Sequence, residues 1–285
     1  MKLGLSTYSL HSKLVSGAMT VLDVIDYAVE HGAEHVEIVP LSYSLTEQPE
    51  LLEQLVEHAK QRGIELSNYA IGANFLQHNP QQIEQEIQRV LGEVDIAAKL
   101  GVKLMRHDVA SCPDVSIANF NRHLDVLATA CRRIADYAAS YGITTSVENH
   151  GYFIQHADRV QMLIEAVNRP NYKTTLDVGN FVCADEQPLA AVSKNLPFAS
   201  MVHIKDFYIR PAHRNPGTGW FTSTSGMYLR GAVIGHGDLD IWEILRLIKS
   251  SGYDGYISVE FEGMEDCLSG AAIGLDNVRR IWDAV

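Results

Sequence analysis

Along the chain, short hydrophobic runs with alternating polar positions are followed by longer stretches in which hydrophobic residues recur every three or four positions. The first pattern predicts a β-strand and the second an amphipathic helix. A glycine precedes many of the strand-like runs, as at Gly32, Gly63, Gly101, Gly142 and Gly252, where the end of a helix favours a left-handed backbone. The first four of these glycines stand 31 to 41 residues apart, about the length of one strand plus one helix.

This repetition predicts eight strands, each followed by a helix. Eight alternating units in 285 residues favour a closed (β/α)8 TIM barrel, an α/β fold, over an open doubly wound sheet. No GxGxxG motif follows the first strand, which also argues against the open sheet. We expect one domain over residues 1–285. The expected strands are 3–7, 35–39, 64–70, 102–107, 144–149, 173–178, 199–205 and 255–261, and the expected helices are 21–29, 50–62, 80–99, 117–140, 159–167, 189–195, 241–250 and 275–284.

Residues 207–234 interrupt the repetition after the seventh strand. This segment has no clear periodicity and is rich in proline and glycine. A long loop in a compact domain is usually a lid or a binding loop, so we expect an inserted, lid-like loop. Its aromatic residues Trp220, Phe221 and Tyr228 suit stacking on a sugar, and they suit packing the loop down or a subunit contact in a homo-oligomer equally well.

Composition restricts the classes of partner. The chain has 23 Lys and Arg against 35 Asp and Glu, a formal net charge of −12, which argues against nucleic acid or an anionic membrane as a partner. No segment reaches the roughly 18 apolar residues of a membrane span, and the N-terminus lacks the apolar core of a secretory signal. The four cysteines lack CxxC spacing and predict no zinc knuckle or disulfide framework, so we expect a cytoplasmic protein.

Polar residues end the last four expected strands. Glu148, Asp177, His203 and Glu260 each close an apolar run, and in such a barrel the active site is built at these strand ends. Alternation along each strand points Glu148 and Glu260 into the barrel. Three carboxylates at close range raise one another's pKa values unless a cation lies between them. A rim salt bridge explains any one of these residues about equally well, but four on successive strands favour one divalent metal ion.

The set of donor atoms limits the identity of the metal to several candidates. Three carboxylates and one imidazole suit Mn, Mg, Co or Zn, and such a site leaves positions for substrate oxygens.

The strand-end segments resemble those of a known family. The segments Val147–His150, Leu176–Asn180, Val202–Asp206, Gly235–Asp240 and Val259–Glu262, in this order, look like those of the xylose isomerase-like TIM-barrel superfamily, specifically its sugar (phosphate) isomerase/epimerase branch. The resemblance covers nearly the whole chain. It implies that Glu148, Asp177, His203 and Glu260 ligate one divalent metal, and that Glu148 and Glu260 are also the catalytic acid/base pair.

The chemistry of such a site leaves two reactions open. A metal chelated by a substrate carbonyl and its neighbouring hydroxyl stabilises the enediolate that forms when one carboxylate removes a proton. Return of a proton by the second carboxylate gives an epimerase or isomerase of a small carbohydrate or polyol. Expulsion of a neighbouring hydroxyl gives a dehydratase instead, of the inosose or dehydroshikimate type. An apurinic-type nuclease is disfavoured by the net charge, and a non-enzymatic barrel would lack the metal.

Further residues at the strand ends are candidates for substrate binding. Several of them also have a simpler explanation. Lys205 suits a rim salt bridge, and His150 suits the orientation of a metal ligand. His236 suits a turn position, beside aspartates that cap the next helix. Glu37, Arg106 and His107 end strands two and four and are weaker candidates, because position alone supports them. The substrate-binding candidates are Lys205, His150, His107, His236 and Glu37.

The sequence also departs from the ketose 3-epimerases of the same branch. Those enzymes resemble this chain at the metal ligands but place a histidine where Asn180 stands, a carboxylate where Ile154 stands and an arginine where Ile209 stands. The expected metal site is unaffected, whereas the identity of the sugar stays open.

Overall fold

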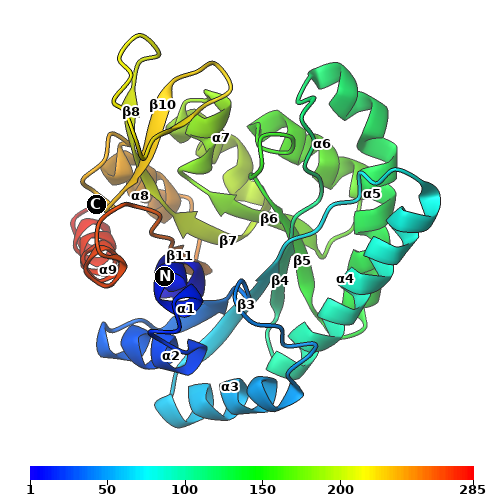
Figure 1. Ribbon diagram of the computed structural model, residues 1–285, viewed down its shortest axis with the longest axis horizontal. Helices are drawn as coiled ribbons and strands as arrows, with labels where there is room; N and C mark the ends of the chain where they lie inside the picture. The colour runs from blue at the N-terminus through cyan, green and yellow to red at the C-terminus, as the bar shows by residue number, and fades with distance from the viewer.

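Eight parallel strands close into a barrel in the computed structural model, which describes all 285 residues (Figure 1). Neighbouring strands follow the order β1-β11-β7-β6-β5-β4-β3-β2. The (β/α)8 prediction is therefore confirmed, and each expected strand is present. The barrel strands are β1 (Lys2–Ser6), β2 (His35–Ile38), β3 (Glu65–Ile71), β4 (Leu104–His107), β5 (Thr144–Glu148), β6 (Tyr172–Asp177), β7 (Ala199–Ile204) and β11 (Tyr256–Val259).

A ring of helices surrounds the strands. The expected helix starts and stops are visible: Thr20 and Asp23 form a capping box at the start of α2, and Gly63 and Gly101 end α3 and α4 with φ of 68° and 78°, a conformation that favours glycine. The ring consists of α2 (Val21–Glu30), α3 (Pro49–Arg62), α4 (Pro80–Leu100), α5 (Ile117–Ala139), α6 (Ala157–Val167), α7 (Pro188–Asn195), α8 (Ile241–Ser250) and α9 (Cys267–Ala284).

Two helical regions differ from the prediction. Helix α9 starts at Cys267, earlier than expected, with Asp266 capping the backbone amide of Ser269. The periodicity is hidden there because Gly270 takes the place of a large apolar residue and lies against the Phe261 ring. After β1 the chain forms short helices that the pattern does not predict. The short helices of the chain are η1 (Thr7–Leu10), α1 (His11–Val15), η2 (Asn180–Ala184) and η3 (Leu196–Phe198).

The inserted segment is not an unstructured loop, and that part of the prediction is wrong. It forms a three-stranded antiparallel sheet, β8 (Asp206–Arg210), β10 (Tyr228–Ala232) and β9 (Phe221–Thr222), in the order β8-β10-β9. The hairpin of β8 and β10 rises beyond the ring of helices (Figure 1). Its alternation is masked because polar and aromatic residues pair across it: Arg230 is opposite Tyr208, with its guanidinium 4.7 Å from the ring centre.

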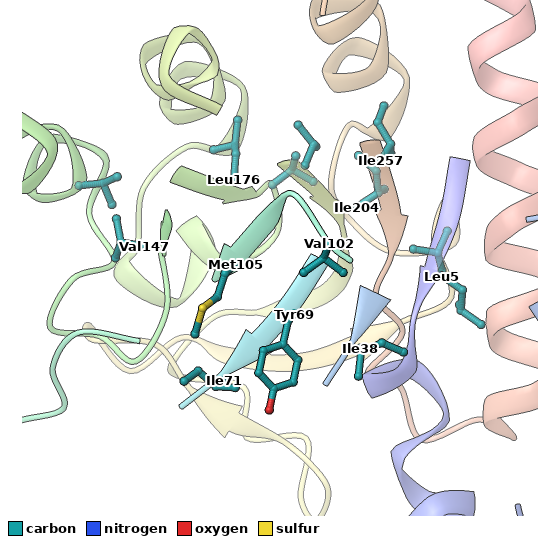
Figure 2. Packing of buried hydrophobic residues seen from close by; sticks show 14 of the residues in the cluster. Leu5, Ile38, Tyr69, Ile71, Val102, Met105, Val147, Leu176, Ile204 and Ile257 are labelled. Atoms are coloured by element: carbon teal, nitrogen blue, oxygen red, sulfur yellow. The ribbon is translucent and has the colours of Figure 1, made fainter. Parts of the chain in front are cut away.

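The hydrophobic core lies between the strands and the helices. Val147, Leu176, Ile204 and Ile257 are fully or almost fully buried (Figure 2). Three of them are next to Glu148, Asp177 and His203 in the sequence, so the same alternation that packs the outer faces turns the polar side chains inward. No helix is both long and apolar enough to cross a membrane, and all four cysteines are free thiols.

Candidate metal centre

Four side chains meet at the carboxyl ends of β5, β6, β7 and β11. One donor atom from each of Glu148, Asp177, His203 and Glu260 lies within 4.8 Å of the other three. All four residues are buried, with 0 to 7% of their surface exposed. The four strands are consecutive around the barrel, so the structure brings together the set that the sequence singles out.

Glu148 is held as a carboxylate by two neighbours. Arg106 donates from Nε to Oε2 at 2.7 Å, and Asn180 donates from Nδ2 to Oε1 at 3.0 Å. Burial acts to raise the pKa of Glu148, but the charges of Arg106, His203 and other nearby cations outweigh it, and the pKa is lowered. Glu148 is thus available as an anionic ligand or base near neutral pH.

Glu37 fixes the orientation of His203. The imidazole Nε2 lies 2.9 Å and 3.0 Å from the two carboxylate oxygens of Glu37, and Asn68 donates to Glu37 Oε1 at 2.8 Å. Burial opposes charge on both partners, yet their attraction prevails: the pKa of Glu37 is lowered and that of His203 is raised to about 10. Because Nε2 faces Glu37, Nδ1 is the nitrogen that faces Asp177 and Glu260.

Two of the atoms in the cluster lack a hydrogen-bond partner. His203 Nδ1 and Asp177 Oδ2 are buried and make no hydrogen bond, although His203 Nδ1 lies 3.7 Å from Glu260 Oε1. The other oxygen of Asp177 accepts from the backbone amides of Gly179 and Asn180, both at 2.8 Å. Buried polar atoms normally have partners, so this arrangement fits a divalent cation bound by three carboxylates and one imidazole.

Without a cation, the cluster is electrostatically unfavourable for Asp177. Burial is the largest cause of its shift, Glu260 and Glu148 add to it, Lys205 and His203 oppose it, and the pKa of Asp177 is raised to about 7. A divalent ion among these carboxylates would favour the charged form of each.

Lys205 contributes a positive charge next to the cluster. Its Nζ lies 2.6 Å from Glu260 Oε2, and 3.3 Å from both Asp177 Oδ2 and Glu262 Oε2. It also donates to Asn180 Oδ1 at 3.3 Å. The salt bridge that we considered as the alternative for Lys205 is therefore present, and contact with a substrate stays a prediction.

A cavity of about 560 Å³ opens onto the cluster, and Glu148, His203 and Glu260 form part of its wall. His150 lines it with its Nδ1 3.5 Å from Asp108 Oδ1. Phe207 and Phe221, from the inserted segment, also line it and pack edge to face with ring centres 5.8 Å apart. The insertion thus covers part of the cavity, as a lid would.

The match to a family model decides the classification. A model described as the xylose isomerase-like TIM barrel matches residues 25–281. The chain belongs to this family. It is 27% identical to an inosose dehydratase of Lacticaseibacillus casei over 165 residues, which are 55% of this chain and 54% of that protein. The chain thus spans about half the length of the curated relatives it matches first.

Solved structures of xylose isomerase-like barrels share the fold. The structure of the IolI protein with a zinc atom has a TM-score of 0.77, 18% identity, and coverage of 100% of this chain and 99% of that one. The apo 3-keto-D-glucoside 4-epimerase YcjR from E. coli has a TM-score of 0.73, 17% identity, and coverage of 98% and 99%. At such identities the likeness shows the fold alone.

Three of the predicted substrate contacts do not line the cavity of this family member. Glu37 is fully buried behind His203. His107 is also fully buried; its Nδ1 lies 2.9 Å from the Asp108 carbonyl oxygen, and its ring packs edge to face on Phe75. Strand β4 turns Arg106 inward, and consecutive residues face opposite sides, so His107 points outward. The structure therefore does not bring Glu37 and His107 to the cavity wall, and a role for them in substrate binding stays a prediction.

His236 is the third of these residues. It is exposed in the turn after β10 and is not among the residues that line the cavity. Asp206 holds this turn by accepting from the backbone amides of Gly235 and Gly237, both at 2.9 Å. Asp240 caps α8, as expected, but Asp238 bonds instead to Ile209 and Arg210 of β8. His236 is therefore a turn residue.

Sequence reasoning undervalued or missed four residues of the site. Arg106 and Asn180 hold Glu148, whereas Asp108 and Glu262 line the cavity. Each stands at or just beyond the end of a strand, which is the signal that identified the metal ligands. Asn180 and Glu262 stand three residues beyond the ends of β6 and β11, so the segments that follow the strands carry site residues as well as the strand ends themselves.

Proposed function

We propose that the protein is a divalent-metal-dependent isomerase or epimerase of a small carbohydrate or polyol. The observation that carries the proposal is the cluster of Glu148, Asp177, His203 and Glu260, whose inward donor atoms lie within 4.8 Å of one another without hydrogen bonds at His203 Nδ1 and Asp177 Oδ2. The zinc atom named in the IolI structure supports a divalent ion, and the donor set suits Mn, Mg, Co or Zn.

The arrangement of the two glutamates suits proton transfer. Glu148 and Glu260 stand on β5 and β11, the outer pair of the four strands, so they flank Asp177 and His203. When bound, a divalent ion polarises a substrate carbonyl and makes the neighbouring C–H bond more acidic. One glutamate then removes the proton and the other returns a proton, to the opposite face for an epimerase or to the adjacent carbon for an isomerase.

Neighbouring residues prepare the glutamates for these roles. Arg106 and Asn180 keep Glu148 ionised and oriented, whereas Lys205 pairs with Glu260 at 2.6 Å. Phe207 and Phe221 cover part of the cavity, and exclusion of water there strengthens each of these electrostatic interactions. The epimerase named among the similar structures is consistent with this reaction.

A dehydratase is the second candidate, because the first curated relatives are named inosose dehydratases. The same proton removal would be followed by loss of a neighbouring hydroxyl group, which needs an acid. His150 is placed for this role on the cavity wall. Burial lowers its pKa, but the bond to Asp108 and the charge of Glu148 prevail, so the pKa of His150 is raised.

One experiment tests the proposal and separates the two reactions. Protein loaded with Mn²⁺, Co²⁺ or Zn²⁺ is incubated in deuterated water with free ketoses, their phosphates, inososes and 3-dehydroshikimate, and followed by NMR. We expect deuterium at one carbon of a product with unchanged composition. Loss of water from the substrate would select the dehydratase, and absence of both exchange and elimination with every compound would contradict the metal-assisted proton transfer.

A further inference from the structure

The cavity above the cluster has a charge pattern that bears on the substrate. Three permanently cationic side chains line it, Arg89, Arg106 and Lys205, against five carboxylates: Glu93, Asp108, Glu148, Glu260 and Glu262. A phosphate or carboxylate group is recognised by cations with donors to spare. The question is therefore whether any of the three cations has a charge that is not already paired with a carboxylate of the protein.

Both arginines are already paired with carboxylates of the barrel. Arg106 uses Nε on Glu148 at 2.7 Å and Nη1 on the Ile71 carbonyl at 3.1 Å, and it also pairs with Asp108. Arg89 donates from Nε to Glu86 at 2.8 Å and from Nη2 to the Gly72 carbonyl at 2.7 Å. Its remaining nitrogen, Nη1, lies 3.7 Å from Glu93. Both side chains serve to hold carboxylates and loops of the barrel itself.

Lys205 contacts two carboxylates of the cluster, and Glu262 is its third carboxylate partner. Two of its carboxylate partners, Asp177 and Glu260, belong to the set that would hold the metal ion. The third, Glu262 at 3.3 Å, does not. Glu262 stands at the rim, with 39% of its side chain exposed, and also accepts from the Tyr8 hydroxyl at 3.1 Å. Lys205 therefore retains a carboxylate when the other two turn to an ion.

A bound metal ion would not make the net charge of the cavity wall positive. It would add two positive charges, but the three carboxylates that would bind it carry three negative ones. The remaining polar groups at the wall, such as the carboxylates of Glu262 and Asp108 and the amides of Asn180 and Gln155, suit the hydroxyl groups of a polyol. Carboxylate oxygens accept hydrogen bonds from hydroxyl groups and repel phosphate or carboxylate oxygens.

We infer that the cavity takes an uncharged polyhydroxylated ketone, and that Glu262 excludes phosphorylated and carboxylated compounds by keeping Lys205 paired. The inference rests on the proposed function, because it concerns the substrate of the same site. Unfavourable placement of like charges is an established way to achieve specificity. Glu262 is thus a specificity-determining residue rather than a metal ligand or an acid/base group.

Binding measured separately from turnover tests the inference. Dissociation constants are determined by calorimetry on the Mn²⁺-loaded full chain for matched pairs: free ketohexoses against their 6-phosphates, and an inosose against 3-dehydroshikimate. We expect the neutral member of each pair to bind at least about tenfold more tightly. Equal or tighter binding of the charged member would overturn the inference. Neutral ligands that bind but exchange no deuterium and lose no water would contradict the proposed function instead.

Variants of Glu262 test its role. Glu262→Gln keeps the size of the side chain but removes its charge, so we expect the preference for neutral compounds to shrink by about tenfold. Glu262→Asp should restore most of that preference. The matched control is Glu265→Gln, whose carboxylate pairs with Arg230 at 3.4 Å and does not line the cavity, and which should leave the preference unchanged. An unchanged preference in Glu262→Gln would show that Glu262 does not select the substrate.

Discussion

The two ends of the barrel each bury a histidine, and the environments differ. At the carboxyl ends of the strands, His203 pairs with Glu37, and its pKa is raised to about 10. At the other end, His35 bonds through Nε2 to the carbonyl oxygens of Lys2 and Ile257, both at 3.2 Å. Burial lowers the pKa of His35 to about 4, and Glu37 and Glu65 oppose this shift only partly.

His35 and Glu37 stand two residues apart on the same face of β2, so one short strand serves both ends. Burial keeps the imidazole of His35 neutral and makes it part of the packing, although the two carbonyl oxygens act in the opposite direction. The carboxylate of Glu37 contacts one nitrogen of His203, and the other nitrogen faces the carboxylates of the cluster. The comparison predicts that changes at the carboxyl end affect activity and metal binding, whereas changes at the amino end affect stability.

The largest effect is expected for the two glutamates at the carboxyl end. Glu148→Gln and Glu260→Gln should each lower kcat by about 10³-fold or more, because each removes a ligand and one half of the acid/base pair. The fold should remain intact, since each change removes one of several crowded negative charges. Steady-state rates with the substrate identified by deuterium exchange, and urea unfolding, measure the two expectations. Near-normal rates in either variant would contradict the mechanism.

At the amino end, Gly4→Ala is expected to destabilise the fold by about 3 kcal/mol. A Cβ on Gly4 would collide with the carbonyl oxygen and the ring of His35, and neither can move without disturbing the strand pair. Urea unfolding checks the value. The control is Gly92→Ala in α4, where a Cβ meets no atom within 4 Å and the better helix propensity should stabilise slightly. Similar results for both variants would show that this contact is not critical.

The neutral His35 also predicts a pH dependence of stability. Its pKa is about 4 in the folded protein and about 6.5 when unfolded. Below pH 6.5 the unfolded chain therefore takes up a proton that the folded chain does not. The free energy of unfolding consequently decreases as the pH is lowered from 6.5 to about 4. At pH 5 this group should cost about 2 kcal/mol relative to pH 7.

His35→Asn isolates the contribution of His35, because acidic groups and His107, whose pKa is also lowered to about 4 by burial, add their own dependence. The drop in unfolding free energy between pH 7 and pH 5 should be smaller by about 2 kcal/mol in the variant. The same drop in both proteins would mean that His35 takes up its proton in the folded state.

The comparison also shows what could be predicted from the sequence. The barrel and the cluster of four residues could be predicted, because alternation along each strand fixes which residues share a face. In addition, the end of an apolar run marks the end of a strand. Val147 and Glu148 illustrate both signals. The inserted sheet could not be predicted. Strand β9 has only two residues, and the residues that pair across the sheet, such as Arg230 and Tyr208, do not produce a regular alternation of polar and apolar positions in the sequence.

The roles of individual polar residues depended on contacts between distant segments. In β4, Leu104 and Met105 are both apolar, so the pattern does not tell whether Arg106 or His107 faces inward. Glu37 was assigned correctly to the end of a strand. Its partner His203 is 166 residues away, however, and no local pattern shows that the carboxylate lies behind the imidazole rather than in the cavity.

Glu37 therefore provides the finest test of the difference between the two ends. Glu37→Gln keeps the size of the side chain but replaces the carboxylate that accepts from His203 Nε2, so the imidazole becomes a weaker and less well oriented donor. We expect affinity for Mn²⁺ to fall about tenfold, equivalent to ~1.4 kcal/mol, by calorimetry, with an altered visible spectrum of the Co²⁺-loaded protein. Glu34→Gln, which changes a carboxylate at the amino end that accepts from the Leu3 amide at 3.1 Å, should leave both readings unchanged. Equal metal affinity in the Glu37 variant and the wild type would mean that burial alone, without the carboxylate, positions His203. The environments of His203 and His35 would then differ less in their effect than the hydrogen-bond partners of the two side chains indicate.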